Sequence, residues 1–266
     1  MKALPAARLG LWAYAAAGIT VGARAALSGP PPVMAAVLGL GGYMFLGTAG
    51  VFWPERGMYG STLWRGPTAQ GEIALTFDDG PSPKTTPQVL AELAKADVRA
   101  TFFLVGRKAE QHPELVREIA AAGHELGLHG FDHDRLFSLR GGSRVAEDIR
   151  RTQAAIARAG VPEPTLFRPP IGFLSHLTVN GARRTGVTLV GCSARAFDGF
   201  ASANVTAVTQ RLTRALEPGA LIAMHDAAEH DDYVPASIAA LPRVLTALRE
   251  RGLRPVTLSS WVSASS

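Results

Sequence analysis

Short apolar runs alternate with amphipathic helical patterns through residues 71–262, and this alternation limits the folds open to the chain. The expected strands are Glu72–Phe77, Arg99–Val105, His124–Leu128, Thr165–Phe167, Val187–Cys192, Ala220–Met224 and Leu253–Leu258. The expected helices are Thr86–Ala96, Pro113–Ala122, Gly142–Ala159, Ser175–Thr185, Val205–Leu216 and Pro235–Arg251. Such alternation predicts an α/β fold with a parallel sheet and helices outside it. Seven strands favour a closed or nearly closed (β/α) barrel, with an open doubly wound sheet as the alternative.

Polar side chains follow five of the expected strands at the point where each strand ends. These residues are Asp78 and Asp79, His129 and His133, Arg168, Asp198, and His225. The carboxyl ends of parallel strands meet on one face of a (β/α) barrel, where active sites lie. The sequence therefore predicts that all seven side chains gather in one active site.

The two histidines are spaced H-x3-H, which suggests a metal site. Whether on a helix or around a turn at Gly130, this spacing can bring both imidazoles together. One of the two carboxylates of Asp78 and Asp79 then completes a set of two histidines and one aspartate with His129 and His133. Such a set leaves coordination positions open for water and substrate, as catalytic metal sites require.

The remaining groups suit the hydrolysis of an amide. The aspartate that does not bind the metal is the candidate base for an attacking water. His225 is the candidate acid for the leaving nitrogen, and Asp198 would hold it as an imidazolium. Arg168 would orient the base carboxylate. The alternatives are a structural salt bridge for Arg168 and a loop cap for Asp198.

Two long runs without charged residues precede the alternating region. Arg24 separates them, and the three prolines at 30–32 divide the second run because they cannot continue a helix interior. Only 18% of the chain is charged, which also suggests a membrane portion. The expected division is a membrane region 1–53 with transmembrane helices 9–27 and 33–53, a linker 54–70 and a catalytic domain 71–262.

Other interpretations of the N-terminal region are a cleaved signal peptide, a single membrane anchor, or a helix pair outside the membrane. In a hairpin, Lys2, Arg8, Arg56 and Arg65 lie on one side and Arg24 alone on the other. The positive-inside rule then favours the cytoplasmic face for the catalytic domain, whereas a single span reverses this orientation. The expected location is the membrane of a bacterial-type cell envelope.

Charge and cysteine content exclude several classes of protein. The net charge is +5, but residues 1–70 hold five of the 27 basic side chains and one of the 22 acidic ones. The rest of the chain is nearly neutral and lacks the basic excess of a nucleic-acid-binding domain, so no nucleic-acid partner is expected. Cys192 is the single cysteine, which excludes an intramolecular disulfide and a cysteine-based zinc site.

Five motifs occur in a characteristic order along residues 71–262. They are TFDDGP (76–81), HGFDH (129–133), FRPPIG (167–172), ARAFDG (194–199) and LIAMHD (221–226). In combination they resemble the polysaccharide deacetylases of carbohydrate esterase family 4, which include chitin, chitooligosaccharide and peptidoglycan deacetylases. The resemblance implies a distorted (β/α) barrel of about seven parallel strands.

The resemblance also assigns a role to each matched residue. Asp78 would be the general base, oriented by Arg168, and His225 the general acid, tuned by Asp198. The backbone N–H of Ile171 would help to stabilise the oxyanion. The implied ligands of a divalent metal, most often zinc and otherwise cobalt, nickel or manganese, are Asp79, His129 and His133.

Four positions depart from the family pattern. Gly130 stands where the second motif has a hydroxyl residue, and Ile171 where the third has tyrosine. In the fourth motif, Arg195 replaces an aspartate and Gly199 a tryptophan. The proposed metal ligands and proton carriers are intact, so we expect the chemistry to be retained and the substrate groove to be altered.

The leading hypothesis is a membrane-anchored, metal-dependent deacetylase that hydrolyses the N-acyl group of an amino sugar. Its expected partners are a polysaccharide, an oligosaccharide or a lipid-linked sugar, together with membrane lipid. The alternative is a catalytically impaired glycan-binding or scaffold protein of the same fold.

Overall fold

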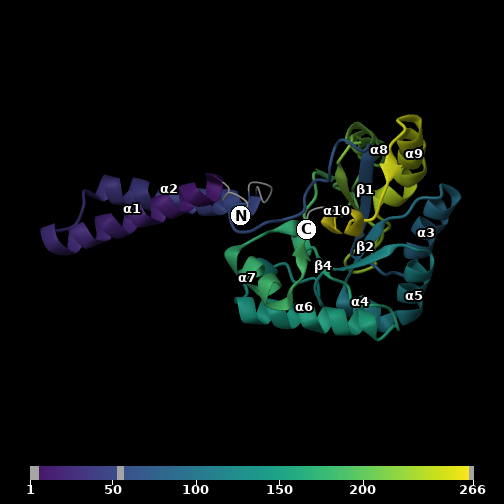
Figure 1. Ribbon diagram of the computed structural model, residues 1–266, viewed down its shortest axis with the longest axis horizontal. Helices are drawn as coiled ribbons and strands as arrows, with labels where there is room; N and C mark the ends of the chain where they lie inside the picture. The colour runs from purple at the N-terminus through teal and green to yellow at the C-terminus, as the bar shows by residue number, and fades with distance from the viewer. Residues whose placement is uncertain (1–5, 53–56, 264–266) are drawn as a thin grey trace.

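The computed structural model describes residues 6–52 and 57–263, and its centre is an eight-stranded parallel sheet (Figure 1). The strands pair in the order β5-β4-β3-β2-β1-β7-β6, and β8 pairs with the start of β1. The strand bounds are β1 Glu72–Asp78, β2 Thr101–Leu104, β3 Glu125–Leu128, β4 Leu166–Phe167, β5 Thr188–Leu189, β6 Ala194–Arg195, β7 Leu221–His225 and β8 Arg254–Pro255. The predicted parallel sheet is confirmed, and its shape is a half-barrel.

Helices connect all successive strands except β5 and β6, and they cover the outside of the half-barrel (Figure 1). Their bounds are α3 Thr86–Lys95, α4 Gly106–Gln111, α5 Pro113–Ala121, α6 Gly142–Ala157, α7 His176–Thr185, α8 Val205–Arg214, α9 Ala236–Glu250 and α10 Ser259–Ser263. Two short 3-10 helices, η2 (Phe137–Leu139) and η3 (Pro170–Gly172), precede α6 and α7. Neighbouring helices α6 and α7, and α8 and α9, pack against each other.

The half-barrel is open between β5 and β6, which lie at opposite ends of the strand order. The sequence predicted one strand, Val187–Cys192, in this region. The structure instead has the two-residue strand β5, a bridge from Val190 to Leu63, and the separate strand β6. The backbone of Leu63 makes hydrogen bonds of 2.8 Å to Leu189 and to Gly191. The segment around Leu63, which lies far upstream in the sequence, thus pairs with the chain that follows β5.

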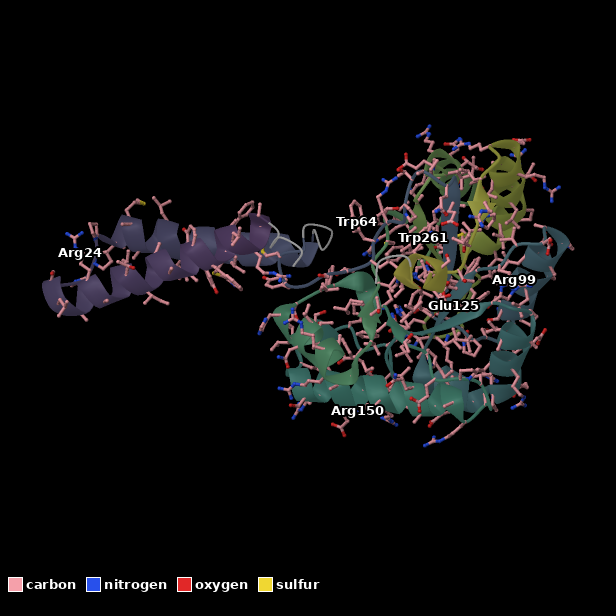
Figure 2. The ribbon with its side chains drawn as sticks, viewed as in Figure 1. Arg24, Trp64, Arg99, Glu125, Arg150 and Trp261 are labelled. Atoms are coloured by element: carbon pink, nitrogen blue, oxygen red, sulfur yellow. The ribbon has the colours of Figure 1, made fainter. Side chains whose placement is uncertain are left out.

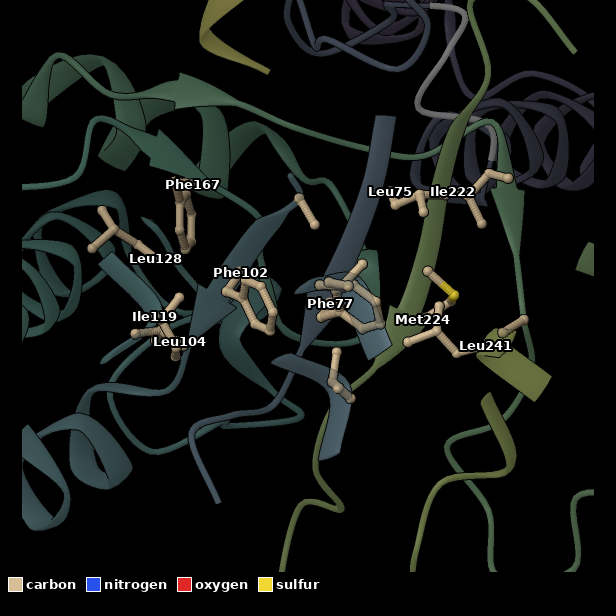
Figure 3. Close-up of a cluster of buried hydrophobic side chains, with 14 of the residues drawn as sticks. Leu75, Phe77, Phe102, Leu104, Ile119, Leu128, Phe167, Ile222, Met224 and Leu241 are labelled. Carbon is tan, nitrogen blue, oxygen red and sulfur yellow. The ribbon is translucent and has the colours of Figure 1, made fainter. Parts of the chain in front are cut away.

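The core lies between the sheet and the outer helices (Figure 3). All seven residues of β1 are buried, and alternate side chains point to opposite faces of the sheet. Phe77 stacks on Phe102 with ring centroids 5.0 Å apart and belongs to this core. Thr76 and Asp78 therefore point to the inner face, so the same alternation that fills the core directs Asp78 into the half-barrel.

Residues 57–70, the described part of the expected linker, lie against the domain. Besides the contacts of Leu63, the N–H of Gly66 donates to Gly219 O at 2.9 Å. Gly66 also lies against the indole of the buried Trp261, where a Cβ would come within 2.3 Å of the ring. Residues 54–56, the start of the expected linker, are outside the described residues.

The N-terminal region contains two paired helices, α1 (Ala6–Ser28) and α2 (Val33–Phe52), as predicted from the sequence. The hydroxyl of Tyr14 donates to Gly39 O at 3.0 Å across the pair. The pair projects from the sheet-containing domain, and Figure 2 shows Arg24 at its far end. Residue 53, the last of the second expected helix, lies outside the described residues.

The expectation that these helices cross a membrane needs correction. Across residues 6–52 and 57–263, none of the helices combines the length and the apolar character that a bilayer crossing requires. The predicted membrane hairpin is therefore unsupported, and the predicted membrane location, with its cytoplasmic orientation, is wrong.

Candidate active site and metal centre

The structure brings together the residues that the sequence predicted as a site. Asp78 and His225 are the last residues of the adjacent strands β1 and β7, where they pair in register. His129 and Arg168 directly follow β3 and β4. With Asp79, His133 and Ile171 these residues line one cleft of about 730 Å³. Asp198 is fully buried beneath the cleft and contacts His225.

Asp79, His129 and His133 form the candidate metal centre. Oδ1 of Asp79 lies 3.4 Å from Nε2 of His129 and 3.2 Å from Nε2 of His133. One ligand atom from each residue falls within 4.8 Å of the others. Nδ1 of His129 lies 2.8 Å from Arg168 O and can donate to it, which leaves Nε2 facing the centre.

The surroundings of these three residues fit a divalent cation. Oδ1 of Asp79 is buried and, within the described part of the chain, accepts no hydrogen bond, which is costly for a carboxylate oxygen without a cation. Burial lowers the pKa of His129 and keeps its imidazole neutral, as a ligand must be. Two imidazole nitrogens and one carboxylate suit zinc and other divalent transition metals.

The segment between the two histidines is a turn rather than a helix. Gly130 has φ +79°, and His133 itself has φ +54°, which is uncommon for a side chain-bearing residue. The N–H of Phe131 donates to Asp148 Oδ1 at 2.9 Å and holds the turn against α6. At Gly130, where the family motif has a hydroxyl residue, a Cβ would lie 3.1 Å from Pro170. Glycine therefore lets this turn pack closely against Pro170.

Glu229 is a contact of His133 that sequence reasoning missed. Its Oε1 lies 3.4 Å from Nδ1 of His133, and its Oε2 accepts from Nη2 of Arg135 at 2.6 Å. A carboxylate beside the outer nitrogen of a ligand histidine fixes the orientation of the ring. The loop after β7 brings Glu229 to this position, and no local sequence pattern signals that contact.

Asp78 is paired with a buried arginine. Nη1 of Arg168 donates to Asp78 Oδ1 at 2.6 Å and to Thr76 Oγ1 at 2.7 Å, and Nη2 donates to Gly191 O at 2.8 Å. The guanidinium lies over the Phe103 ring, 4.2 Å from its centroid. Burial alone would raise the pKa of Asp78, but the positive charge of Arg168 holds that pKa below its ordinary value. Asp78 is therefore ionised at neutral pH.

His225 is paired with a buried aspartate. Nδ1 of His225 lies 2.8 Å from Asp198 Oδ1, and the backbone N–H of His225 donates to Asp198 Oδ2 at 3.0 Å. Burial alone would lower the pKa of His225, but the Asp198 carboxylate overcomes this effect and raises the pKa to about 10. Nε2 of His225 faces the cleft, 3.9 Å from Asp79 Oδ2, and the ring is charged at neutral pH.

Ile171 lies in η3, directly after the Arg-Pro-Pro segment that carries Arg168. Its φ is +62°, a strained conformation for a β-branched residue, and such strain is concentrated at functional sites. The N–H of Gly172 donates to Pro169 O at 2.9 Å, and Arg195 Nη1 donates to Ile171 O at 3.2 Å. These contacts hold the strained backbone at the edge of the cleft.

The departure at Gly199 opens the cleft beside the candidate acid. A Cβ at Gly199 would lie 3.3 Å from Cε1 of His225, so a larger side chain there would cover the imidazole. The neighbouring rings of Phe197 and Phe200 line the cleft and are well exposed. Sequence reasoning did not select these rings, because exposed aromatic residues in a loop carry no periodic signal.

A parallel half-barrel whose strand ends assemble a His-His-Asp cluster, an arginine-bound aspartate and an aspartate-bound histidine defines a class of hydrolase. Comparison with known proteins identifies the family. The model of the polysaccharide deacetylase family matches residues 65–190. A peptidoglycan-N-acetylglucosamine deacetylase from Bacillus cereus is 31% identical over 75% of this chain and 92% of its own length.

Two further relatives agree with this assignment. A chitooligosaccharide deacetylase from Sinorhizobium fredii is 32% identical over 73% of this chain and 93% of its own. A family 4 carbohydrate esterase from Streptomyces lividans, solved with acetate, has a TM-score of 0.63 and is 34% identical. That similarity covers 70% of this chain and 92% of the esterase. The chain belongs to the polysaccharide deacetylase family, and it is an enzyme of that hydrolase type, as predicted.

Proposed function

We propose that this protein removes the N-acetyl group from N-acetylglucosamine residues of peptidoglycan or chitooligosaccharides. Relatives named for these two substrates align over most of their own length. The observation that carries the proposal is that an ionised Asp78, a protonated His225 and the His-His-Asp cluster face the same cleft. The membrane lipid and the lipid-linked sugar expected as partners have no counterpart in the names of these relatives.

Asp79, His129 and His133 would hold a divalent cation, with zinc as the first choice for this donor set. When bound, such a cation supplies Lewis acidity at the acyl carbonyl and lowers the pKa of water. The remaining steps depend on the protein's own groups.

Asp78 acts as the base. Its carboxylate accepts a proton from the water whose oxygen forms a bond to the acyl carbon. Arg168 holds Asp78 in one orientation and keeps it ionised before the reaction. The backbone N–H of Ile171 stabilises the negative charge that develops on the acyl oxygen.

His225 acts as the acid. Its imidazolium gives a proton to the amide nitrogen as the carbon–nitrogen bond breaks, because an unprotonated amine anion is too basic to leave. Asp198 accepts from Nδ1–H and so stabilises the imidazolium, whose Nε2 carries the proton that is transferred. The products are acetate and a free amino sugar. Asp78 then releases its proton to solvent and His225 takes up a proton from solvent, which restores both charges.

The test measures acetate release by the full-length protein from chitooligosaccharides and from peptidoglycan, with zinc or with a chelator. Asp78→Asn should lower kcat at least about a hundredfold while zinc remains bound, since it removes the base and no metal ligand. The matched control is Asp97→Asn, at an exposed turn position with φ +52° that asparagine tolerates. Full activity of Asp78→Asn would refute the assignment of Asp78 as the base. No acetate release by the zinc-loaded natural protein would support the alternative of a catalytically impaired glycan-binding protein.

A further inference from the structure

Arg195 occupies a position in the cleft that the proposed mechanism does not use. It is the last residue of β6 and pairs in register with Ala223, two residues before His225. Its side chain is half-buried and lines the cleft next to Ile171. A Cβ at Gly172 would lie 2.4 Å from its Nη2, so the absence of a side chain there makes room for the guanidinium.

Arg195 differs from the other two arginines of the cleft because no carboxylate balances its charge. Arg168 donates to Asp78 at 2.6 Å, and Arg135 donates to Glu229 at 2.6 Å. Arg195 donates to the neutral carbonyl of Ile171 at 3.2 Å. Among residues 6–52 and 57–263, no carboxylate oxygen lies within 4.0 Å of the Arg195 guanidinium, the distance limit for an ion pair.

A half-buried cation without a counterion favours an anionic ligand. A guanidinium offers five N–H donors, and its planar fork matches a carboxylate with two parallel hydrogen bonds. Partial burial strengthens such a contact, because water competes less for the donors. A neutral sugar hydroxyl would leave the charge of Arg195 uncompensated.

We propose that Arg195 forms a subsite for a carboxylate carried by the glycan, on the sugar that is deacetylated or on its neighbour. This proposal rests on the proposed deacetylase function. The carboxylate subsite would lie close to the acyl group, because both contact the backbone of Ile171. The N–H of Ile171 serves the acyl oxygen and its carbonyl accepts from Arg195, and one residue spans only about 3.8 Å. In peptidoglycan strands freed of their stem peptides, every second sugar carries such a carboxylate in its lactyl group, whereas chitooligosaccharides are neutral. The subsite therefore selects peptidoglycan strands whose lactyl carboxylates are free.

The experiment compares two glycans that differ only in charge. Peptidoglycan strands freed of peptides are offered with their lactyl carboxylates free, or with the same carboxylates converted to methyl esters. The readout is the ratio of kcat/KM for acetate release from the free acid and from the ester. We expect a ratio of about ten for the natural protein, the scale of one hydrogen-bonded charge pair, and a fall towards one at high salt.

Substitutions at Arg195 test the origin of the ratio. Arg195→Gln should bring the ratio close to one, and Arg195→Lys should retain part of it because the charge remains but the fork is lost. The matched control is Arg117→Gln, an exposed arginine of α5, which should leave the ratio unchanged. A ratio that is unchanged in Arg195→Gln, or rates that fall equally on both glycans, would overturn the subsite and indicate that Arg195 only supports Ile171.

Failure of the proposed function has a different signature. If the natural protein releases acetate from neither glycan, the deacetylase proposal fails, and the subsite is then tested by calorimetric binding of the two glycans. Tighter binding of the free acid that disappears in Arg195→Gln supports the subsite, and equal binding overturns it.

Discussion

Replacing Asp198 by asparagine tests how the cleft keeps His225 protonated. Asp198 is fully buried, and its two oxygens bind the ring and the backbone N–H of His225 at 2.8 and 3.0 Å. Asparagine has nearly the same shape but carries no charge. The substitution therefore removes the electrostatic support of the imidazolium while the burial that opposes it remains.

The size of the effect follows from the type of contact. A hydrogen bond to a charged group contributes about 1.5–3 kcal/mol, and one pKa unit corresponds to about 1.36 kcal/mol. The hydrogen bond alone therefore accounts for about one to two units, and the pKa of His225, about 10 in the natural protein, should fall by at least this amount in Asp198→Asn because the charge is lost as well. The acid must be protonated, so activity is lost as the pH rises through this pKa, and the substitution moves that loss to lower pH.

The stability of the folded protein should also fall in Asp198→Asn, and the loss should depend on pH. The folded-state pKa of His225 is raised above the ordinary value of 6.5, so its contribution to stability is complete below pH 6.5. This contribution disappears as the pH rises from 6.5 towards 10. Asp198→Asn should therefore lower the melting temperature most at acidic and neutral pH, and the difference from the natural protein should shrink in alkaline buffer.

The assay is the pH dependence of kcat/KM for acetate release, with melting curves on the same samples. Asp232→Asn is a suitable control, since this exposed carboxylate also lines the cleft but makes no contact with His225 among the described residues. An alkaline limb that stays in place in Asp198→Asn, or a limb near pH 6.5 in the natural protein, would refute the assigned pairing.

Two further substitutions test the metal centre and the base. Glu229→Gln should weaken zinc binding about 10- to 100-fold in a competition titration, because His133 loses the carboxylate that orients it. An unchanged affinity would show that the turn holds His133 in position without Glu229. Arg168→Met leaves Asp78 buried without its counterion, so the free energy of unfolding should fall by about 3–5 kcal/mol in denaturant titrations. In the same variant the acidic limb of kcat/KM should move to higher pH, since the pKa of Asp78 rises; a limb that moves to lower pH would contradict the pairing.

Long apolar runs made most of the sheet predictable. Strands β1 and β7 lie within one residue of the predicted bounds, because each consists mainly of apolar residues and ends at a charged or polar residue. The predicted strand Val187–Cys192 was too long, since the bridge between Leu63 and Val190 comes from a segment far upstream. Local pattern does not encode such long-range pairing, and tertiary contacts decide the strand ends.

The N-terminal helices show a different limit of local pattern. Apolar runs divided by prolines correctly predicted α1 and α2, because alanine, leucine and methionine favour helices and proline interrupts them. The count of uncharged residues located these two helices, but it did not establish a membrane crossing, for which none of the described helices is long and apolar enough.

Position after a strand made the central site residues predictable, because parallel strands converge at their carboxyl ends. Asp78, His129, Arg168 and His225 all lie within one residue of such an end. Glu229 lies in a loop, and its contact with His133 depends on how that loop folds back over the cleft. The unbalanced charge of Arg195 is likewise visible only when the partners of the neighbouring arginines are known.

The paired counterions explain how one buried cleft can hold a base and an acid in opposite protonation states. Burial acts against the charged form of both Asp78 and His225, so an apolar cleft would leave both neutral. Arg168, after β4, reverses this effect for Asp78, and Asp198, after β6, reverses it for His225. Each counterion comes from a different strand than the group it serves, so the correct charges exist only in the folded half-barrel. Both groups are then charged over the same neutral pH range, in which the base can accept a proton while the acid can give one.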